Sequence, residues 1–272
     1  MAVASLLCQT YENWELIFVD DGSTDGSAEF VESVEDKRIK VFRFDKNYGR
    51  PYARQKALDE ARGDYVAMLD SDDWYYSDKL EKQVKFMEEN PSIGVVSSGM
   101  IIVNNDQVAT GYRCCRKINS QINNGYKVKL NIANAPSLIK SKYAKKTQYN
   151  NIRGEDVDFL ARILIEAKYS NISEILYVYA EQASFNVRNI REIYLSRKSY
   201  LKKLDQNYSI KKREEIVKMK LKYLIKRLLF LLSLEEYILK RRNMVPTEEM
   251  LEKYNHEKNI VLKTANELKE SS

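Results

Sequence analysis

Short apolar runs alternate with amphipathic stretches along the first half of the chain. The runs at residues 14–19, 39–44 and 65–69 are rich in β-branched and aromatic residues and too short for helices, so they predict buried strands. The stretch at residues 51–61 begins with Pro and carries Ala and Leu at helical spacing, which predicts a helix. This alternation favours an α/β fold in which a mostly parallel sheet is sandwiched by helices.

Acidic residues follow two of these predicted strands. Asp20 and Asp21 come after the first, and Asp70, Asp72 and Asp73 come after the third. The carboxyl ends of parallel strands meet at one edge of a sheet, where ligands collect, so we expect these acids to lie together. Like charges this close favour a divalent cation among them. A polar turn or a helix cap explains the same residues without a ligand.

Further candidate residues lie at the starts of predicted helices. Arg50 and Arg54 are placed to meet phosphate, although a solvated surface role is equally consistent with their positions. Glu155 and Asp156 open the amphipathic stretch that continues through residue 167. Acids in a first turn ordinarily stabilise the helix dipole, and a carboxylate there can also act as a general base.

Composition restricts the class of protein. The chain has 272 residues, of which 44% are hydrophobic, enough for a substantial core. Its cysteines, Cys8, Cys114 and Cys115, have neither metal-ligand spacing nor the pattern of a disulfide framework, which favours a reducing compartment. The first residues lack the features of a signal peptide, and no run approaches a membrane span of ~18 apolar residues. We therefore expect a cytoplasmic protein.

Positive charge is concentrated late in the chain. Residues 188–245 contain 17 Lys and Arg against 6 Asp and Glu, whereas the whole chain has a net charge of +6. This change predicts a first domain at residues 1–187, which would carry the candidate site, and a basic helical extension at residues 188–272. Within the extension, residues 219–234 predict a basic amphipathic helix. This helix either lies on the inner face of an anionic membrane or packs on the first domain or on a sister subunit. No recognised module supports nucleic-acid binding.

Two ordered motifs identify a family. F-V-D-D-G-S-T-D-G-S at residues 18–27 and N-Y-G-R-P-Y-A-R-Q-K-A-L-D-E-A-R-G-D-Y-V-A-M-L-D-S-D-D-W at residues 47–74 resemble family 2 glycosyltransferases with the GT-A fold. The resemblance covers residues 2–184. It implies an inverting, metal-dependent sugar transfer from a nucleotide-sugar, usually a UDP-sugar, to a hydroxyl on a glycan or lipid-linked acceptor in surface polysaccharide biosynthesis.

The resemblance also implies roles for the acids that follow the strands. Asp20, with Asp21 beside it, would contact the uracil ring. Arg54 would meet the donor region, and Asp70 would lie on the ribose side of the donor. In the metal-binding DXD motif, Asp72 with Asp73 would hold Mg²⁺ or Mn²⁺ at the diphosphate.

The acid pair late in the predicted first domain, the catalytic domain by this resemblance, matches the catalytic pair of the family. On that match Asp156 is the general base and Glu155 is its acceptor-side partner. Such roles agree with the chemistry, because a diphosphate leaving group gathers negative charge and the acceptor hydroxyl must lose a proton.

Three features depart from the family pattern. The family begins with a central strand and this chain begins in the helix after it, so we expect either an upstream start or a truncated product. Ala180 and Gln182 occupy places where the family often has Tyr-Arg followed by His, and Gln55 replaces a common Asn.

Two other functions fit parts of the pattern. A catalytically inactive remnant that binds a partner would keep the fold without the activity. A receiver-like phosphoacceptor domain also has acids after its strands, but such a domain has ~120 residues and leaves Glu155 and Asp156 unexplained.

Overall fold

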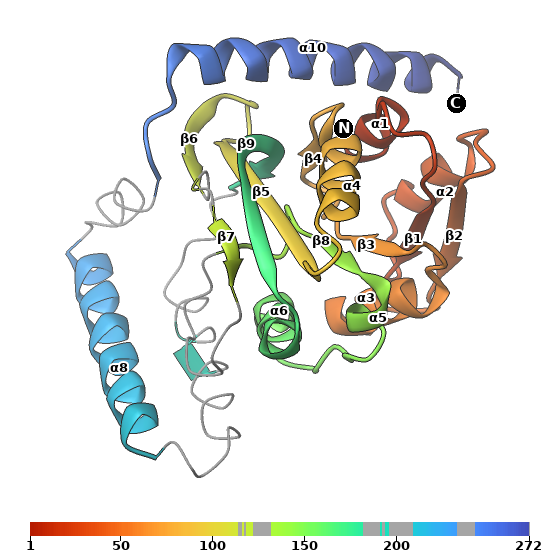
Figure 1. Ribbon diagram of the computed structural model, residues 1–272. Helices are drawn as coiled ribbons and strands as arrows, with labels where there is room; N and C mark the ends of the chain where they lie inside the picture. Colours follow the sequence, from red (N-terminus) through yellow and green to blue (C-terminus); the bar gives the residue numbers. More distant parts are fainter. Residues whose placement is uncertain are drawn as a thin grey trace.

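Two β-sheets organise the part of the chain that the structure describes (Figure 1). The computed structural model describes residues 1–113, 116, 118–121, 132–181, 191, 194, 195, 209–232 and 243–271. In the smaller sheet, β1 (Leu16–Asp20) pairs in parallel with β2 (Ile39–Arg43), and helix α2 (Ser27–Glu32) connects them. This unit follows the predicted alternation of strand and helix.

The larger sheet is mixed. Its strands run in the order β3 (Tyr65–Ala67), β8 (Leu138–Lys140), β5 (Val95–Val103), β9 (Tyr169–Ala180) and β4 (Trp74–Tyr75), with β6 (Ala109–Arg113) on β5 and β7 (Ile118–Gln121) on β9. Only the pairing of β5 with β9 is parallel among the described strands of this sheet. The predicted α/β fold is confirmed, but the expectation that its sheet is mostly parallel is wrong. Hairpin β5–β6 and the short strands β4 and β8 add antiparallel pairings that the alternation of strand and helix did not predict.

Around these sheets lie the helices α1 (Ala2–Leu7), α3 (Arg50–Glu60), α4 (Lys79–Glu89), α5 (Ser141–Ala144), α6 (Glu155–Glu166) and α10 (Glu248–Ser271). Helix α8 (Ser209–Leu231) stands to one side of them (Figure 1). The largest apolar cluster joins Leu58 of α3 with Phe159 and Leu164 of α6, against Val66 and Val95 of the sheet. This packing holds α3 and α6 in place relative to each other. No helix within the described ranges is long and apolar enough to cross a bilayer.

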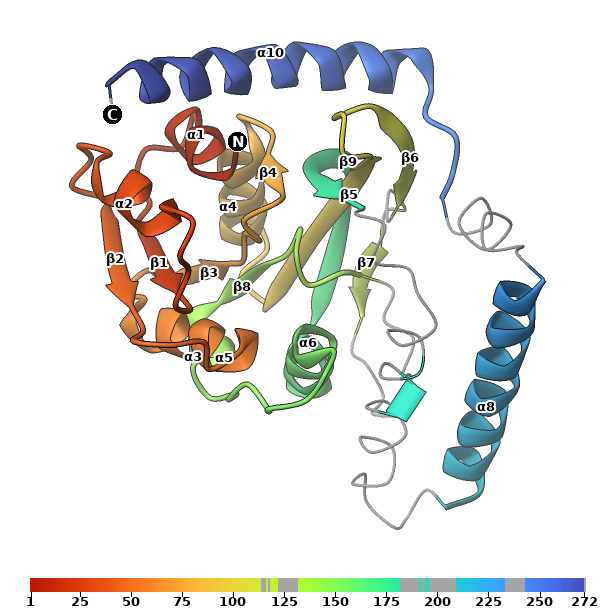
Figure 2. The ribbon, with the colours of Figure 1, turned by 180° about the vertical axis from the view of Figure 1, so that it is seen from behind.

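Helix α10 is built into the body of the protein (Figure 2). Its Tyr254 and Val261 are buried in one cluster with Trp74 and Ile101. Residues 182–190 lie outside the described residues, so the unit boundary at residue 187 stays a prediction. Gln182, Cys114 and Cys115 also lie outside the described residues.

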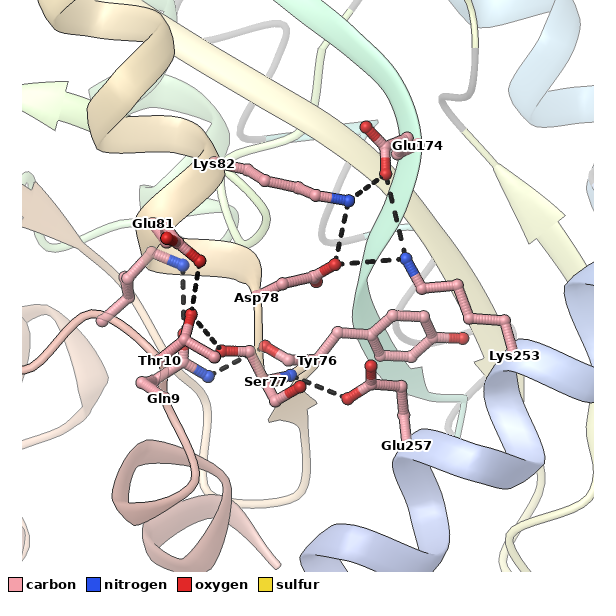
Figure 3. Close-up of polar contacts among 11 residues, drawn as sticks. Gln9, Thr10, Tyr76, Ser77, Asp78, Glu81, Lys82, Glu174, Lys253 and Glu257 are labelled. Atoms are coloured by element: carbon pink, nitrogen blue, oxygen red, sulfur yellow. Dashed lines mark hydrogen bonds and ion pairs between the residues drawn. The ribbon is translucent and has the colours of Figure 1, made fainter.

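Polar contacts strengthen the docking of α10 (Figure 3). Lys253 lies 3.3 Å from an oxygen of Asp78 and 3.8 Å from one of Glu174, and Lys82 contacts the same two carboxylates. The backbone N–H of Ser77 donates to Glu257 over 2.8 Å. The chain just after β4 is thus held by the C-terminal helix.

A cavity of about 1530 Å³ separates the two sheets. Strand β1 lines one side of the cavity and β3 lines the opposite side, and these two strands are not hydrogen-bonded to each other. The apolar residues of β1 are only half-buried as a result. At one end the Glu15 carboxylate bridges the gap by accepting from the N–H groups of Arg62 and Gly63. The opposite end carries the predicted acids.

Candidate functional site

Arg54 is the centre of the site. It lies in the first half of α3, and its guanidinium donates to Asp70 over 2.6 Å and to Glu155 over 2.7 Å. Burial alone would lower the pKa of Arg54, but the charges of Asp70, Asp156 and Glu155 raise it above its usual value. Arg54 therefore stays charged and joins acids from two distant segments.

A tight turn after β3 carries the next three acids. The N–H of Asp73 donates to the carbonyl of Asp70, which closes the turn. The carboxylate of Asp73 is buried and accepts from the hydroxyl of Tyr177 over 2.6 Å and from the N–H of Ala180 over 2.8 Å. Burial raises the pKa of Asp73 to about 7. Both oxygens of Asp73 are engaged by β9, so this residue anchors the turn.

Asp72 differs from its neighbour because it is exposed and lines the cavity. Loss of hydration and the nearby charge of Asp70 raise the pKa of Asp72. A cation near Asp70 and Asp72 would relieve this repulsion. Mg²⁺ is commonly held by one or two carboxylates together with substrate phosphates, so Asp72, beside the charge of Asp70, fits such an ion. Within the described ranges, no three acidic, His or Cys side chains form a metal-binding group by themselves.

Asp20 and Asp21 shape the loop after β1. The carboxylate of Asp20 is buried and accepts from the N–H of Ser23. Asp21 accepts from the N–H groups of Tyr48 and Gly49 over 2.7 and 2.9 Å, which ties this loop to the start of α3. Both acids therefore cap backbone donors while lining the cavity.

Gly22 permits this close approach of the two loops. Its φ is +74°, and a Cβ there would lie 2.6 Å from the backbone carbon of Lys46. No side chain fits at this position without movement of the backbone.

The start of α6 presents the predicted catalytic pair. Gly154 precedes the helix in the left-handed conformation, with φ of 79°. Glu155 is buried against Arg54, whereas Asp156 is half-buried and close enough to influence the pKa of Arg54 and Tyr149. Asp156 is therefore the more accessible member of the pair.

Sequence reasoning missed Tyr149. Its ring stacks on Phe159 with centroids 4.1 Å apart, and its hydroxyl is buried with no hydrogen-bond partner among the described residues. Burial raises the pKa of Tyr149. The side-chain oxygen of Gln55 accepts from the N–H of Tyr149 over 2.8 Å, so Gln55 holds this segment to α3. The sequence signal for Tyr149 is weak, because it consists only of the position of this residue shortly before α6.

The site thus connects Asp70, Arg54 and Glu155 by direct contacts. The same cavity is lined by Asp20, Asp21, Arg50, Arg54, Asp70 and Asp72, while Asp73 holds the turn in place through Tyr177. Positive side chains beside carboxylates at an open cavity are suited to an anionic ligand that brings a cation with it.

Comparison with known proteins identifies the family. Residues 2–137 match the family model described as Glycosyl transferase family 2. An uncharacterised glycosyltransferase of Haemophilus influenzae is 35% identical over 191 residues, which cover 68% of this chain and 72% of that protein. A second relative, from Escherichia coli, is the UDP-Glc:alpha-D-GlcNAc-diphosphoundecaprenol beta-1,3-glucosyltransferase WfaP, 33% identical over 189 residues, or 68% of this chain and 73% of that protein.

Other matches are shorter or structural. The putative teichuronic acid biosynthesis glycosyltransferase TuaG of Bacillus subtilis is 51% identical over 89 residues, which is 32% of this chain and 35% of TuaG. The crystal structure of residues 1–349 of S. aureus TarS in complex with UDP has a TM-score of 0.57, covers 79% of this chain and 65% of that one, and is 22% identical. That likeness concerns the fold alone. The motifs, the fold and the relatives agree, and the chain belongs to glycosyl transferase family 2.

Proposed function

We propose that the chain transfers a sugar from a nucleotide-sugar, most simply a UDP-sugar, to a hydroxyl of a glycan or lipid-linked acceptor in surface polysaccharide biosynthesis. The observation that carries the proposal is the cavity whose rim brings together Arg54, Asp70 and Asp72, with Glu155 behind them. A nucleoside diphosphate offers what this rim would recognise, namely phosphates for arginine and a cation for carboxylates.

Each side chain has a role in this proposal. Arg50 and Arg54 attract the diphosphate, while Asp20 and Asp70 line the part of the cavity that would take the nucleoside. Asp72 would hold Mg²⁺ or Mn²⁺, with Asp73 fixing the turn. The bound cation would supply Lewis-acid stabilisation of the leaving diphosphate.

Asp156 takes the proton in the proposed reaction. The acceptor oxygen attacks the anomeric carbon as the bond from that carbon to the diphosphate oxygen breaks, which inverts the configuration. The acceptor proton passes to the Asp156 carboxylate, and Glu155 keeps its ion pair with Arg54. Asp156 suits this role because it is more accessible than Glu155.

WfaP supports the choice of acceptor. Its name describes glucosyl transfer from UDP-Glc to a sugar on diphosphoundecaprenol. We propose that the present chain also uses a lipid-linked acceptor. Such an acceptor would place the reaction at the cytoplasmic face of a membrane.

The experiment compares Asp156→Asn with the parent. Purified protein is given Mn²⁺ and a panel of UDP-sugars with a diphospholipid-linked sugar acceptor, and UDP release is followed together with UDP affinity. The proposal expects the variant to bind UDP as the parent does and to lose transfer by about 10²–10⁴-fold, the usual contribution of a general base. Equal transfer rates in the two proteins would contradict the role of Asp156.

A further inference from the structure

Helix α8 has an exposed apolar face that the proposed reaction does not use. Six of its large apolar side chains are between 47% and 75% exposed. With about 100° between successive helical residues, these six fall within a stripe about 120° wide, as broad as a core-facing stripe. We name them the outer stripe: Val217, Leu221, Leu224, Ile225, Leu228 and Leu231.

The opposite face of α8 already has neighbours. Ile216, Met219, Tyr223 and Phe230 are half-buried there. Tyr223 stacks on Tyr194 with ring centroids 4.7 Å apart. The helix therefore uses one apolar face for contact with its own chain, while its second apolar face is exposed.

Basic side chains border the outer stripe on both sides. Lys218 and Lys222 lie along one border, Lys220 and Arg227 lie along the other, and all four are exposed. No acidic residue occurs between Ile216 and Leu232. Long basic side chains can extend their charge to lipid phosphates while their stems stay on apolar surface.

This charge pattern argues against a second copy of the chain as the partner. Val217, Leu221, Leu224, Leu228 and Leu231 have the alternating spacing of a coiled-coil seam. A stable coiled coil places opposite charges beside its seam, whereas here both borders are basic. Two copies would therefore bring like charges together, and an anionic surface would neutralise them.

We infer that the outer stripe lies in the interface of an anionic membrane, with α8 parallel to the bilayer plane. The apolar side chains enter the region between headgroups and acyl chains, and the bordering Lys and Arg contact lipid phosphates. The inference deepens the proposed function and rests on it. Membrane binding through α8 would hold the enzyme where a lipid-linked acceptor is found.

Vesicle sedimentation with the full chain tests the inference. The probes are vesicles of phosphatidylcholine alone and of phosphatidylcholine with phosphatidylglycerol. The parent is expected to sediment with the anionic vesicles at least tenfold more strongly than with the neutral ones, and added salt should weaken the binding. Equal binding to both vesicles, or no binding to either, would overturn the inference.

Two variants test the named face. Leu224→Ser with Leu228→Ser should lower binding to anionic vesicles more than tenfold, because apolar burial is lost. Lys220→Gln with Arg227→Gln should lower it about tenfold. The matched control, Val108→Ser with Val245→Ser, removes two exposed apolar side chains elsewhere and should bind as the parent does. If either α8 variant binds like the control, the inference fails.

Two further measurements distinguish the alternative explanations. Sedimentation velocity of the parent should show a monomer, and a dimer that dissociates in Leu224→Ser with Leu228→Ser would assign the stripe to a second copy and overturn the inference. UDP binding in the presence of Mn²⁺ should be equal in parent and α8 variants. Membrane binding without any UDP binding would contradict the proposed function and leave the inference supported.

Discussion

Arg54 and Glu155 form an ion pair with 2.7 Å between Nη1 and Oε1, across 101 positions of sequence. The pair links α3 to α6, and the same guanidinium also holds Asp70. The side chain of Glu155 is only 2% exposed, so its carboxylate lies largely out of water beside Arg54. Removing Arg54 would leave this buried carboxylate with only the more distant and exposed Arg50 as a neighbouring cation.

We therefore expect Arg54→Gln to lower the free energy of unfolding by about 3–5 kcal/mol, the cost of breaking a buried pair. Urea denaturation measures this loss. Arg50→Gln is the matched control, since Arg50 lies 3.5 Å from the same oxygen but is 66% exposed. It should cost less than about 1 kcal/mol. Similar losses in the two variants would show that Arg54 is an ordinary surface cation.

A second prediction concerns the loop at the rim. Gly22→Ala should be destabilised both by its positive φ and by the clash with the backbone of Lys46. Gly26→Ala has a similar φ, +82°, but its Cβ meets nothing within 4 Å, so it should lose only the conformational part, about 1–2 kcal/mol. Thermal unfolding of both variants gives the difference. A loss no greater in Gly22→Ala than in Gly26→Ala would contradict the close contact between the loops.

A third prediction tests the docking of α10. The Tyr254 side chain is buried, its ring lies 5.8 Å from that of Trp74, and its hydroxyl donates to the carbonyl of Gln107 over 2.7 Å. Tyr254→Ala should cost about 3–5 kcal/mol, as for other buried aromatic truncations. Tyr254→Phe loses only the hydrogen bond and should cost about 1 kcal/mol. If Tyr254→Ala were as stable as the parent, α10 could not belong to the core.

A fourth prediction follows from a buried lysine. Lys79 has no exposed surface, and its ammonium donates to Gln83 over 2.7 Å. Burial lowers the pKa of Lys79 from 10.5 to about 7. Between these pH values the unfolded chain binds more protons than the folded one, so this group makes stability rise with pH.

The measurement is urea denaturation at several pH values from 7 to 10. The free energy of unfolding of the parent should rise relative to Lys79→Met, with a slope of at most about 1.4 kcal/mol per pH unit, the limit for one proton. Lys85→Met removes an exposed lysine and should follow the parent. Parallel pH profiles for parent and Lys79→Met would mean that Lys79 keeps its ordinary pKa.

The sequence predicted the elements near the site well because local signals determine them. Apolar runs ended in acids at Asp20 and Asp70, and the Pro after Arg50 marked the start of α3, as the structure has them. The arrangement of the larger sheet needed long-range information. A short strand such as β4 has two residues, and its antiparallel pairing with Tyr177 and Val178 leaves no periodic signal in the sequence.

The different environments of the acidic residues could not be predicted from the sequence either. Asp72 and Asp73 are adjacent and chemically identical, yet one is exposed and the other is buried against Tyr177, more than 100 positions away. Helix α10 is rich in charged residues, so the sequence did not indicate which few side chains, such as Val261, enter the core. Such differences arise from packing between distant segments.

The most direct test of the central claim is calorimetric titration of UDP with and without Mn²⁺, using the parent, Asp72→Asn and the exposed control Asp106→Asn. The account predicts that Mn²⁺ strengthens UDP binding to the parent and to Asp106→Asn, and that Asp72→Asn loses this dependence on Mn²⁺. Binding of UDP that is equally strong with and without Mn²⁺ in all three proteins would contradict a cation held at the carboxylate rim.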